Sequence, residues 1–200
     1  MKRFLISAIL IALGLISYSQ SKHSNQIDLS GSMLRNNVFR FRKMEGGGYV
    51  DNGDGFRFGL QYSKLITDKI WFNTGFGYLK ASNVWHGDFI GPFSPQLSGS
   101  QETFIIQIPV RMRLDLLNWL YFKTGLTIDF QTNNKAGNYV DNQSGVGFSF
   151  VGGIDLKLTK SIHFNIEPEL GITSLIYFDR KKSQQHFLLT GINFNVGYRF

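Results

Sequence analysis

The 200-residue chain contains no cysteine. That absence excludes disulfides, thiolate metal ligands, cysteine nucleophiles and a lipid-modified amino-terminal cysteine together. Charged residues are also sparse, at 18 %, and yet only 42 % of the residues are hydrophobic. Beyond the amino terminus there is no run of about 18 or more apolar residues, so the sequence offers no helical membrane span.

Aromatic residues and glycine are abundant, at 15 % of the chain and 22 residues respectively. Both are typical of a β-barrel with aromatic girdles and close-packed small residues. The length favours a single domain. The net charge of +7 comes from basic residues scattered along the chain, so no nucleic-acid partner is expected.

Residues 1–20 have the features of a secretory signal peptide, and residues 21–200 are then the exported domain. The segment has a basic start, an apolar core too short to span a bilayer, and small residues before a cleavage site. The basic start is Lys2 and Arg3, the apolar core is residues 4–16, and the small residues are Ser17 and Ser19. The alternative is a buried amino-terminal helix, which the sudden change to polar sequence disfavours.

The stretch 186–200 alternates with a period of two. Apolar or aromatic residues occupy every second position, and small, polar or charged residues lie between them. The apolar set is Ile192, Phe194, Val196, Tyr198 and Phe200. The pattern predicts a strand with one apolar face that ends on an aromatic residue.

The same alternation recurs along the chain and predicts about eight strands in all. The others are 25–36, 55–64, 69–80, 103–116, 119–131, 145–158 and 161–177. Long loops (36–54, 81–102, 132–144 and 178–185) alternate with tight turns, so a meander would place every long loop on one rim. The sequence therefore predicts an all-β, eight-stranded antiparallel up-and-down barrel whose strands reach the ~9–11 residues needed to cross a membrane.

A barrel with one apolar face can turn that face inward or outward. The apolar faces carry almost no charge, and the polar faces are rich in Gly, Asn, Ser and Thr rather than Lys and Glu. In lipid, closure would also remove every unpaired strand edge. These features favour an outward apolar face, and a soluble lipocalin-type ligand carrier with an apolar interior remains the alternative.

The polar faces then line the lumen, which about eight strands leave only wide enough for side chains. Mixed charges on these faces predict a structural network that fills it. Its candidates are Arg57, Arg111, Arg113, Lys123, Asp129, Asp155, Lys157, Glu167, Glu169 and Arg199, with His163. Arg111 and Glu167 lie equally far from their turns, so we expect them to pair across the lumen.

Two prolines fall in the middle of predicted strands, where a closed ladder has no free edge. They are Pro109 and Pro168. We expect a bulge or a local bend at each.

The stretch TFIIQIPVRMRLDLLNWLYFKTG (103–125) resembles the PorT-like family of small bacterial outer-membrane β-barrels. The leader, the rhythm of hairpins and the terminal GYRF are similar too, so the resemblance covers the whole exported chain. It implies an integral, porin-like outer-membrane protein of Gram-negative bacteria with four extracellular loops. It also implies that Phe194, Val196, Tyr198 and Phe200 form the signal read by the barrel assembly machinery.

The expected partners follow from that resemblance: outer-membrane lipid and lipopolysaccharide, and the assembly machinery during insertion. A component of a secretion machinery or an extracellular molecule of unknown identity is a further possible partner. PorT itself is linked to type IX protein secretion, and nothing in this sequence singles out that role. Arg180 to Lys182 are interpreted as solvated charges, with lipopolysaccharide phosphates as an alternative contact.

No motif predicts catalytic, cofactor or metal chemistry. Enzymes of this size that modify lipid A group His, Ser and an acid near the outer rim, whereas His23, His86, His163 and His186 are widely spaced. DNGDG at 51–55 lacks calcium-loop spacing, and GGG at 46–48 lacks the Lys of a phosphate loop. We therefore expect no enzyme and no cofactor, with a secretion component or a lipid A-modifying enzyme as alternatives.

Overall fold

The computed structural model describes residues 24–40, 49–87, 98–133, 140–179 and 185–200. The predicted signal peptide, the GGG motif and the Arg180 to Lys182 cluster lie outside the described residues. No helix in the described part of the chain is long and apolar enough to cross a bilayer.

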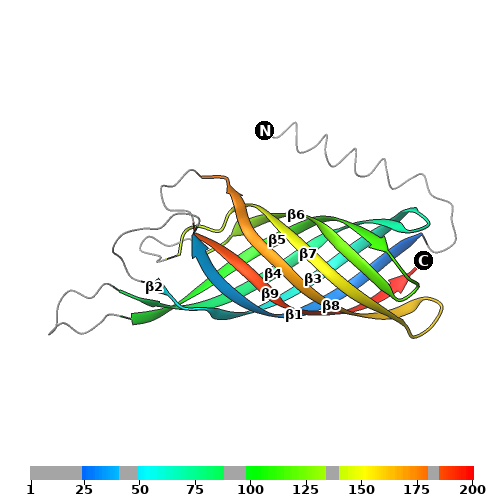
Figure 1. Ribbon diagram of the computed structural model, residues 1–200, viewed down its shortest axis with the longest axis horizontal. Helices are drawn as coiled ribbons and strands as arrows, with labels where there is room; N and C mark the ends of the chain where they lie inside the picture. Colours follow the sequence, from blue (N-terminus) through cyan, green and yellow to red (C-terminus); the bar gives the residue numbers. More distant parts are fainter. Residues whose placement is uncertain (1–23, 41–48, 88–97, 134–139, 180–184) are drawn as a thin grey trace.

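Eight long strands form a closed antiparallel barrel, as the sequence predicts (Figure 1). They are β1 (Asn25–Arg40), β3 (Gly53–Thr67), β4 (Ile70–His86), β5 (Ser98–Asp115), β6 (Leu120–Gln131), β7 (Gly145–Lys157), β8 (Ile162–Tyr177) and β9 (Gln185–Arg199). Consecutive strands pair, and β1 also pairs with β9, which closes the barrel. Because every long strand has two neighbours, the barrel has no open sheet edge along its length.

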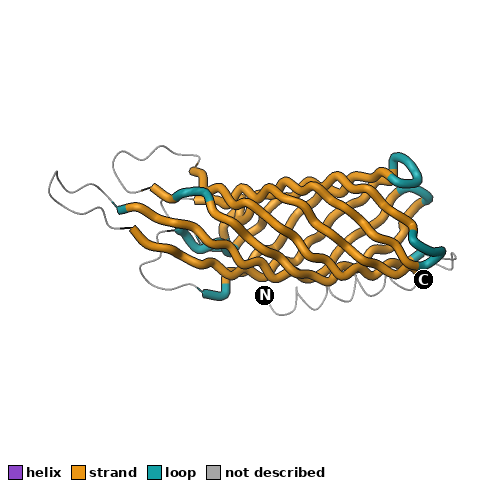
Figure 2. Tube along the Cα trace, turned by 90° about the horizontal axis from the view of Figure 1, so that it is seen from below, coloured by secondary structure: helices purple, strands orange, loops and turns teal. Residues whose placement is uncertain are grey.

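The two ends of the barrel differ, as Figure 2 shows: tight turns lie at one end, and strands of unequal length project at the other. The carboxyl terminus lies at the turn end, where the backbones of Asn25 and Phe200 exchange hydrogen bonds of 3.0 and 2.9 Å. At the loop end, β1 and β4 run on beyond their predicted ends. A further two-residue strand, β2 (Tyr49–Val50), pairs there with β4 and is too short to show any periodicity.

The apolar rows point outward and the polar rows inward. Leu29 is 66 % exposed and Phe58 59 %, whereas Asp28 is 1 % exposed and Asn73 fully buried. A soluble ligand carrier would bury its apolar rows, so that alternative is wrong. Successive side chains in a strand point to opposite faces, which is why the alternation indicated these faces correctly.

The two prolines interrupt pairing without shifting the strand register. Between β4 and β5 the partners on either side of Pro109 keep one continuous register, and β7 and β8 do the same around Pro168. The register shift in β7–β8 lies instead between Val146 and Phe148, opposite Ser174, which has a φ of 49°. Neither proline therefore has a bulge, and on its other side each pairs normally with the neighbouring strand. The alternative expectation of a local bend at each proline stays a prediction.

An apolar cluster occupies the lumen at the loop end, which the sequence interpretation of a uniformly polar interior did not include. One member, Val140, belongs to the long connection between β6 and β7 and is only 3 % exposed. The cluster consists of Leu34, Leu79, Ala81, Ile105, Val140, Phe187 and Leu189. The lumen thus has an apolar section at its loop end and a charged section nearer the turns.

Candidate functional site

The centre of the lumen is crossed by an ion pair between Arg57 on β3 and Glu169 on β8. Arg57 Nη1 donates to Glu169 Oε1 at 3.0 Å, and its Nη2 contacts Oε2. The same guanidinium donates to Gln107 Oε1 at 3.2 Å and to Asn193 Oδ1 at 3.0 Å. A planar guanidinium fits a carboxylate with two parallel bonds, so this pair ties one wall of the barrel to another in a defined geometry.

A second guanidinium shares the same carboxylate. Arg111 Nη2 lies 3.4 Å from Glu169 Oε1. The predicted pair between Arg111 and Glu167 is therefore wrong: Glu167 accepts from Lys123 Nζ at 2.6 Å and from the Tyr121 hydroxyl. The prediction counted residues from the turns and ignored the tilt and stagger of the strands. Because of both, two residues that are equally far from their turns can lie at different depths in the barrel.

The turn end of the lumen holds a second charged group. Arg113 Nε lies 2.6 Å from Asp115 Oδ1, and its Nη2 lies 3.4 Å from Asp155 Oδ2. Arg199 Nη2 also donates to Asp155 Oδ2. The Arg113 guanidinium lies 3.7 Å from the ring centroid of Tyr121, so these buried charges have ring faces as well as carboxylates for partners.

The remaining predicted lumen residues divide into two groups. Buried Asp129 accepts from Gln107 Nε2 at 2.9 Å, and His163 Nε2 lies 2.7 Å from Asp28 Oδ1. Lys157, in contrast, is exposed. It is the last residue of β7, where the strand leaves the barrel, so its predicted place inside the network is wrong.

Several residues that contribute to the network were missing from the prediction, among them Asp28, Gln107, Tyr121 and Asn193. These four lie on the inward rows that the alternation identifies, and all are 3 % exposed or less. Asp115, the partner of Arg113 at the turn end, was missing as well. The signal was therefore present, but the prediction counted mainly charged groups in the later strands. Buried charges need hydrogen-bonding neutral partners as well, because each lone pair or proton left over adds to the cost of burial.

The four candidate residues of the insertion signal all lie on the outer surface of the barrel. Phe194 is 41 % exposed, Val196 54 %, Tyr198 54 % and Phe200 48 %. Phe194, Val196 and Tyr198 form one row along β9 toward the turn end, and Phe200 directly follows the strand. Their position is that of an outward apolar row, and their use as an insertion signal stays a prediction.

The histidines in the described part of the chain have different neighbours. His186 is fully buried at the loop end, with Nδ1 3.0 Å from the Ser174 carbonyl oxygen. His163 is buried near the turn end, whereas His86 lies at the loop end with Nε2 3.0 Å from Asp51 Oδ2. The His86 ring stacks on Tyr49, with ring centroids 4.5 Å apart. Among the described residues, no group of three or more His, Asp or Glu side chains is placed to hold a metal ion.

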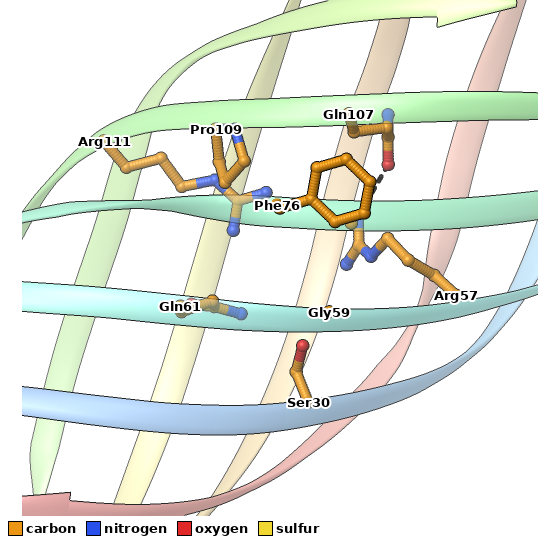
Figure 3. Close-up of a pocket in the computed structure, with 9 residues that line it drawn as sticks. Ser30, Arg57, Gly59, Gln61, Phe76, Gln107, Pro109 and Arg111 are labelled. Carbon is orange, nitrogen blue, oxygen red and sulfur yellow. Dashed lines mark hydrogen bonds between the residues drawn. The ribbon is translucent and has the colours of Figure 1, made fainter. Parts of the chain in front are cut away.

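Two cavities among the described residues lie beside charged side chains of the lumen. The smaller, shown in Figure 3, has a volume of about 20 Å³ and lies beside Arg57, Gln107 and Arg111, with Phe76 and Pro109 in its lining. That volume holds roughly one water molecule. The larger cavity has a volume of about 440 Å³ and lies at the turn end, where Asp155, Lys157 and Arg199 contribute to its lining.

Comparison with known proteins gives one family match. The outer membrane protein beta-barrel domain matches residues 8–200. Among solved structures, OprG from Pseudomonas aeruginosa is similar with a TM-score of 0.48 and 14 % identity, over 90 % of this chain and 97 % of that one.

Two further solved structures are similar at the same level of identity. AlkL in DMPC lipid bilayers has a TM-score of 0.46 and 14 % identity, over 91 % of this chain and 94 % of that one. Ail of Yersinia pestis, in complex with the heparin analogue sucrose octasulfate, has a TM-score of 0.40 and 14 % identity, over 88 % of this chain and 99 % of that one. No curated protein matches the sequence.

Proposed function

Since the chain belongs to the outer membrane protein beta-barrel domain family and forms an eight-stranded barrel of the outer membrane, we propose that it is a barrel with a closed lumen and a structural or interaction role. The long loops at one end carry the interaction. Loops of this length are commonly binding segments on a rigid scaffold.

The observation that carries this proposal is the layer of ion pairs across the centre of the lumen. Arg57, Arg111, Lys123, Glu167 and Glu169 are all between 0 and 7 % exposed. A solute passing through would have to separate these pairs and leave charges buried without partners, which costs several kcal/mol for each ion. The layer therefore favours a closed barrel over a pore.

The connection between β6 and β7 supports closure at the loop end. Val140 packs into the apolar cluster, and Gln143 Nε2 donates to the Gln185 carbonyl at 2.8 Å. The Gln143 side chain also accepts from Thr173 Oγ1 at 2.7 Å, and its backbone N–H donates to Gln131 Oε1 at 2.7 Å. Val140 and Gln143 are thus buried at the loop end of the lumen, and Gln143 is held to three strands.

The general organisation of bacterial outer-membrane barrels gives the orientation. Their short turns and termini face the periplasm and their longer loops face outward. The outer apolar rows then contact lipid and, in the outer leaflet, lipopolysaccharide. The row from Phe194 to Phe200 serves the assembly machinery as its insertion signal.

The role is also proposed to be non-catalytic. Attack on an outer-leaflet lipid needs a nucleophile and a base together at the loop end. His163 is buried with Asp28 near the opposite end, and His86 has the half-exposed Asp51 and the Tyr49 ring as its neighbours. His186 lies at the loop end but is fully buried, with Nδ1 3.0 Å from the Ser174 carbonyl oxygen, so an outer-leaflet lipid has no access to it. Lipid A mass spectra of a strain lacking the protein are expected to match those of the parent strain.

Planar-bilayer recording tests the closed lumen. We expect no current above leak after insertion of the purified barrel, with a known porin in the same bilayer as the positive control. Steady single-channel currents would overturn the proposal. Crosslinking in intact cells followed by capture of the barrel would then distinguish a barrel acting alone from one that belongs to a larger assembly.

A further inference from the structure

We propose that the turn-end cavity is a binding site for a short zwitterionic peptide, a role separate from that of the loops. The cavity volume of about 440 Å³ lies within the range typical of small-molecule sites. With the turns facing the periplasm, such a ligand would come from that compartment.

An unsatisfied polar atom in the lining of the cavity points to a ligand. Asp155 forms the floor of the cavity, and its side chain is 2 % exposed. Its Oδ1 has no hydrogen-bond partner among the described residues. Buried polar atoms are nearly always hydrogen-bonded, so this floor offers one acceptor to an incoming ammonium group.

The floor is rigid before any ligand arrives. Asp155 Oδ2 is held by Arg113 and Arg199, and Arg113 is fixed in turn by Asp115 at 2.6 Å. Trp71 Nε1 donates to Asp115 Oδ2 at 2.9 Å, and both guanidinium groups lie within 5.7 Å of the Trp71 ring centroid. Side chains held in this way lose little further freedom on binding, which favours affinity.

The charges around the cavity indicate what kind of ligand fits. Three carboxylates and three cations contribute to the lining: Asp68, Asp115 and Asp155, and Lys69, Lys157 and Arg199. A simple anion or a simple cation would meet as much repulsion as attraction there. A molecule with an ammonium group and a carboxylate can pair with both signs, and Leu116 and Leu117 offer apolar contact to its side chains.

Calorimetric titration of the refolded barrel in lipid nanodiscs tests the proposal, with dialanine as the zwitterionic probe. N-acetyl-dialanine and dialanine amide each lack one of the two charges. We expect dialanine to bind, and each capped form to bind at least about tenfold more weakly, because a charge-assisted hydrogen bond is lost.

Substitutions inside and outside the cavity lining test whether dialanine binds there. Lys157→Gln is expected to weaken dialanine about twofold to fivefold, since Lys157 is an exposed charge. Lys160→Gln makes the same change in the neighbouring turn, outside the cavity lining, and should leave binding unchanged. Asp155→Asn should abolish binding, and heat-shift electrophoresis checks that this variant still folds.

Three results would overturn the proposal. Absence of dialanine binding would mean that the cavity holds only water. Equal binding of dialanine and its capped forms would exclude recognition of both charges. Equal weakening by Lys157→Gln and Lys160→Gln would show a general effect of net charge, and this comparison stands even if Asp155→Asn does not fold.

Discussion

Replacing Glu169 by Gln tests the ion-pair layer at its centre. The two carboxylate oxygens accept from three side chains: Oε1 from Arg57 and Arg111, and Oε2 from Arg57 and Asn193. Glutamine keeps the shape of the side chain but replaces one oxygen by an NH₂ group. Whichever oxygen is replaced, the new NH₂ group faces a donor of Arg57.

The expected cost follows from the charges left behind. Arg57 and Arg111 are 7 % and 3 % exposed and would share a site with no carboxylate between them. Removing one partner of a buried ion pair costs about 3–5 kcal/mol. We expect Glu169→Gln to lower the free energy of unfolding by about 4 kcal/mol, since two cations lose their counter-charge together.

Urea titration of the barrel in lipid vesicles, followed by tryptophan fluorescence, measures this change. Glu102→Gln is the matched control, because Glu102 pairs with Lys80 at 2.6 Å while both side chains are about half exposed, at 49 % and 48 %. An exposed pair of this kind contributes about 0–1 kcal/mol. If both substitutions lowered stability by the same small amount, the layer would not hold the barrel together, and the reasoning would fail.

Three further predictions concern other parts of the barrel. Lys123→Met leaves Glu167 buried without its cation and should cost about 3–5 kcal/mol in the same titration, whereas an unchanged midpoint would contradict the pairing. Gly153→Ala would place a Cβ 2.2 Å from Cζ of Tyr121, so we expect about 1–3 kcal/mol of destabilisation, and wild-type stability would show that the ring can move freely. Phe200→Ala should slow insertion in cells while leaving the unfolding midpoint of the refolded barrel within about 1 kcal/mol of wild type, and normal insertion would remove its role as a signal.

The alternation of residue types was sufficient to predict the strands and the direction of their faces. A side chain in a strand points to one face or the other, so the rows containing Phe58 and Arg57 could be assigned from the sequence alone. The order of long and short connections likewise predicted which ends of the strands lie together. The direction of each side chain and the lengths of the connections can both be read from short stretches of the sequence, without knowledge of the tertiary structure.

The pairing of charges across the lumen depended on the closed barrel. Arg57 and Glu169 are 112 positions apart, and only the tilt and stagger of the strands place them at one depth. The same geometry directs Arg111 to Glu169 rather than to Glu167. It also keeps the register unbroken at Pro109, because β6 pairs normally with β5 there.

The apolar section of the lumen and the turn-end cavity likewise come from the tertiary structure. Val140 lies in a polar stretch of the sequence and shows no pattern, yet it becomes buried because it packs against residues of β1, β4, β5 and β9. Asp155 is one of many polar residues in the sequence, and only closure places it between Arg113 and Arg199. Periodicity determined which residues face the lumen, whereas contacts between distant strands decided which of them meet, because alternation carries no information about depth.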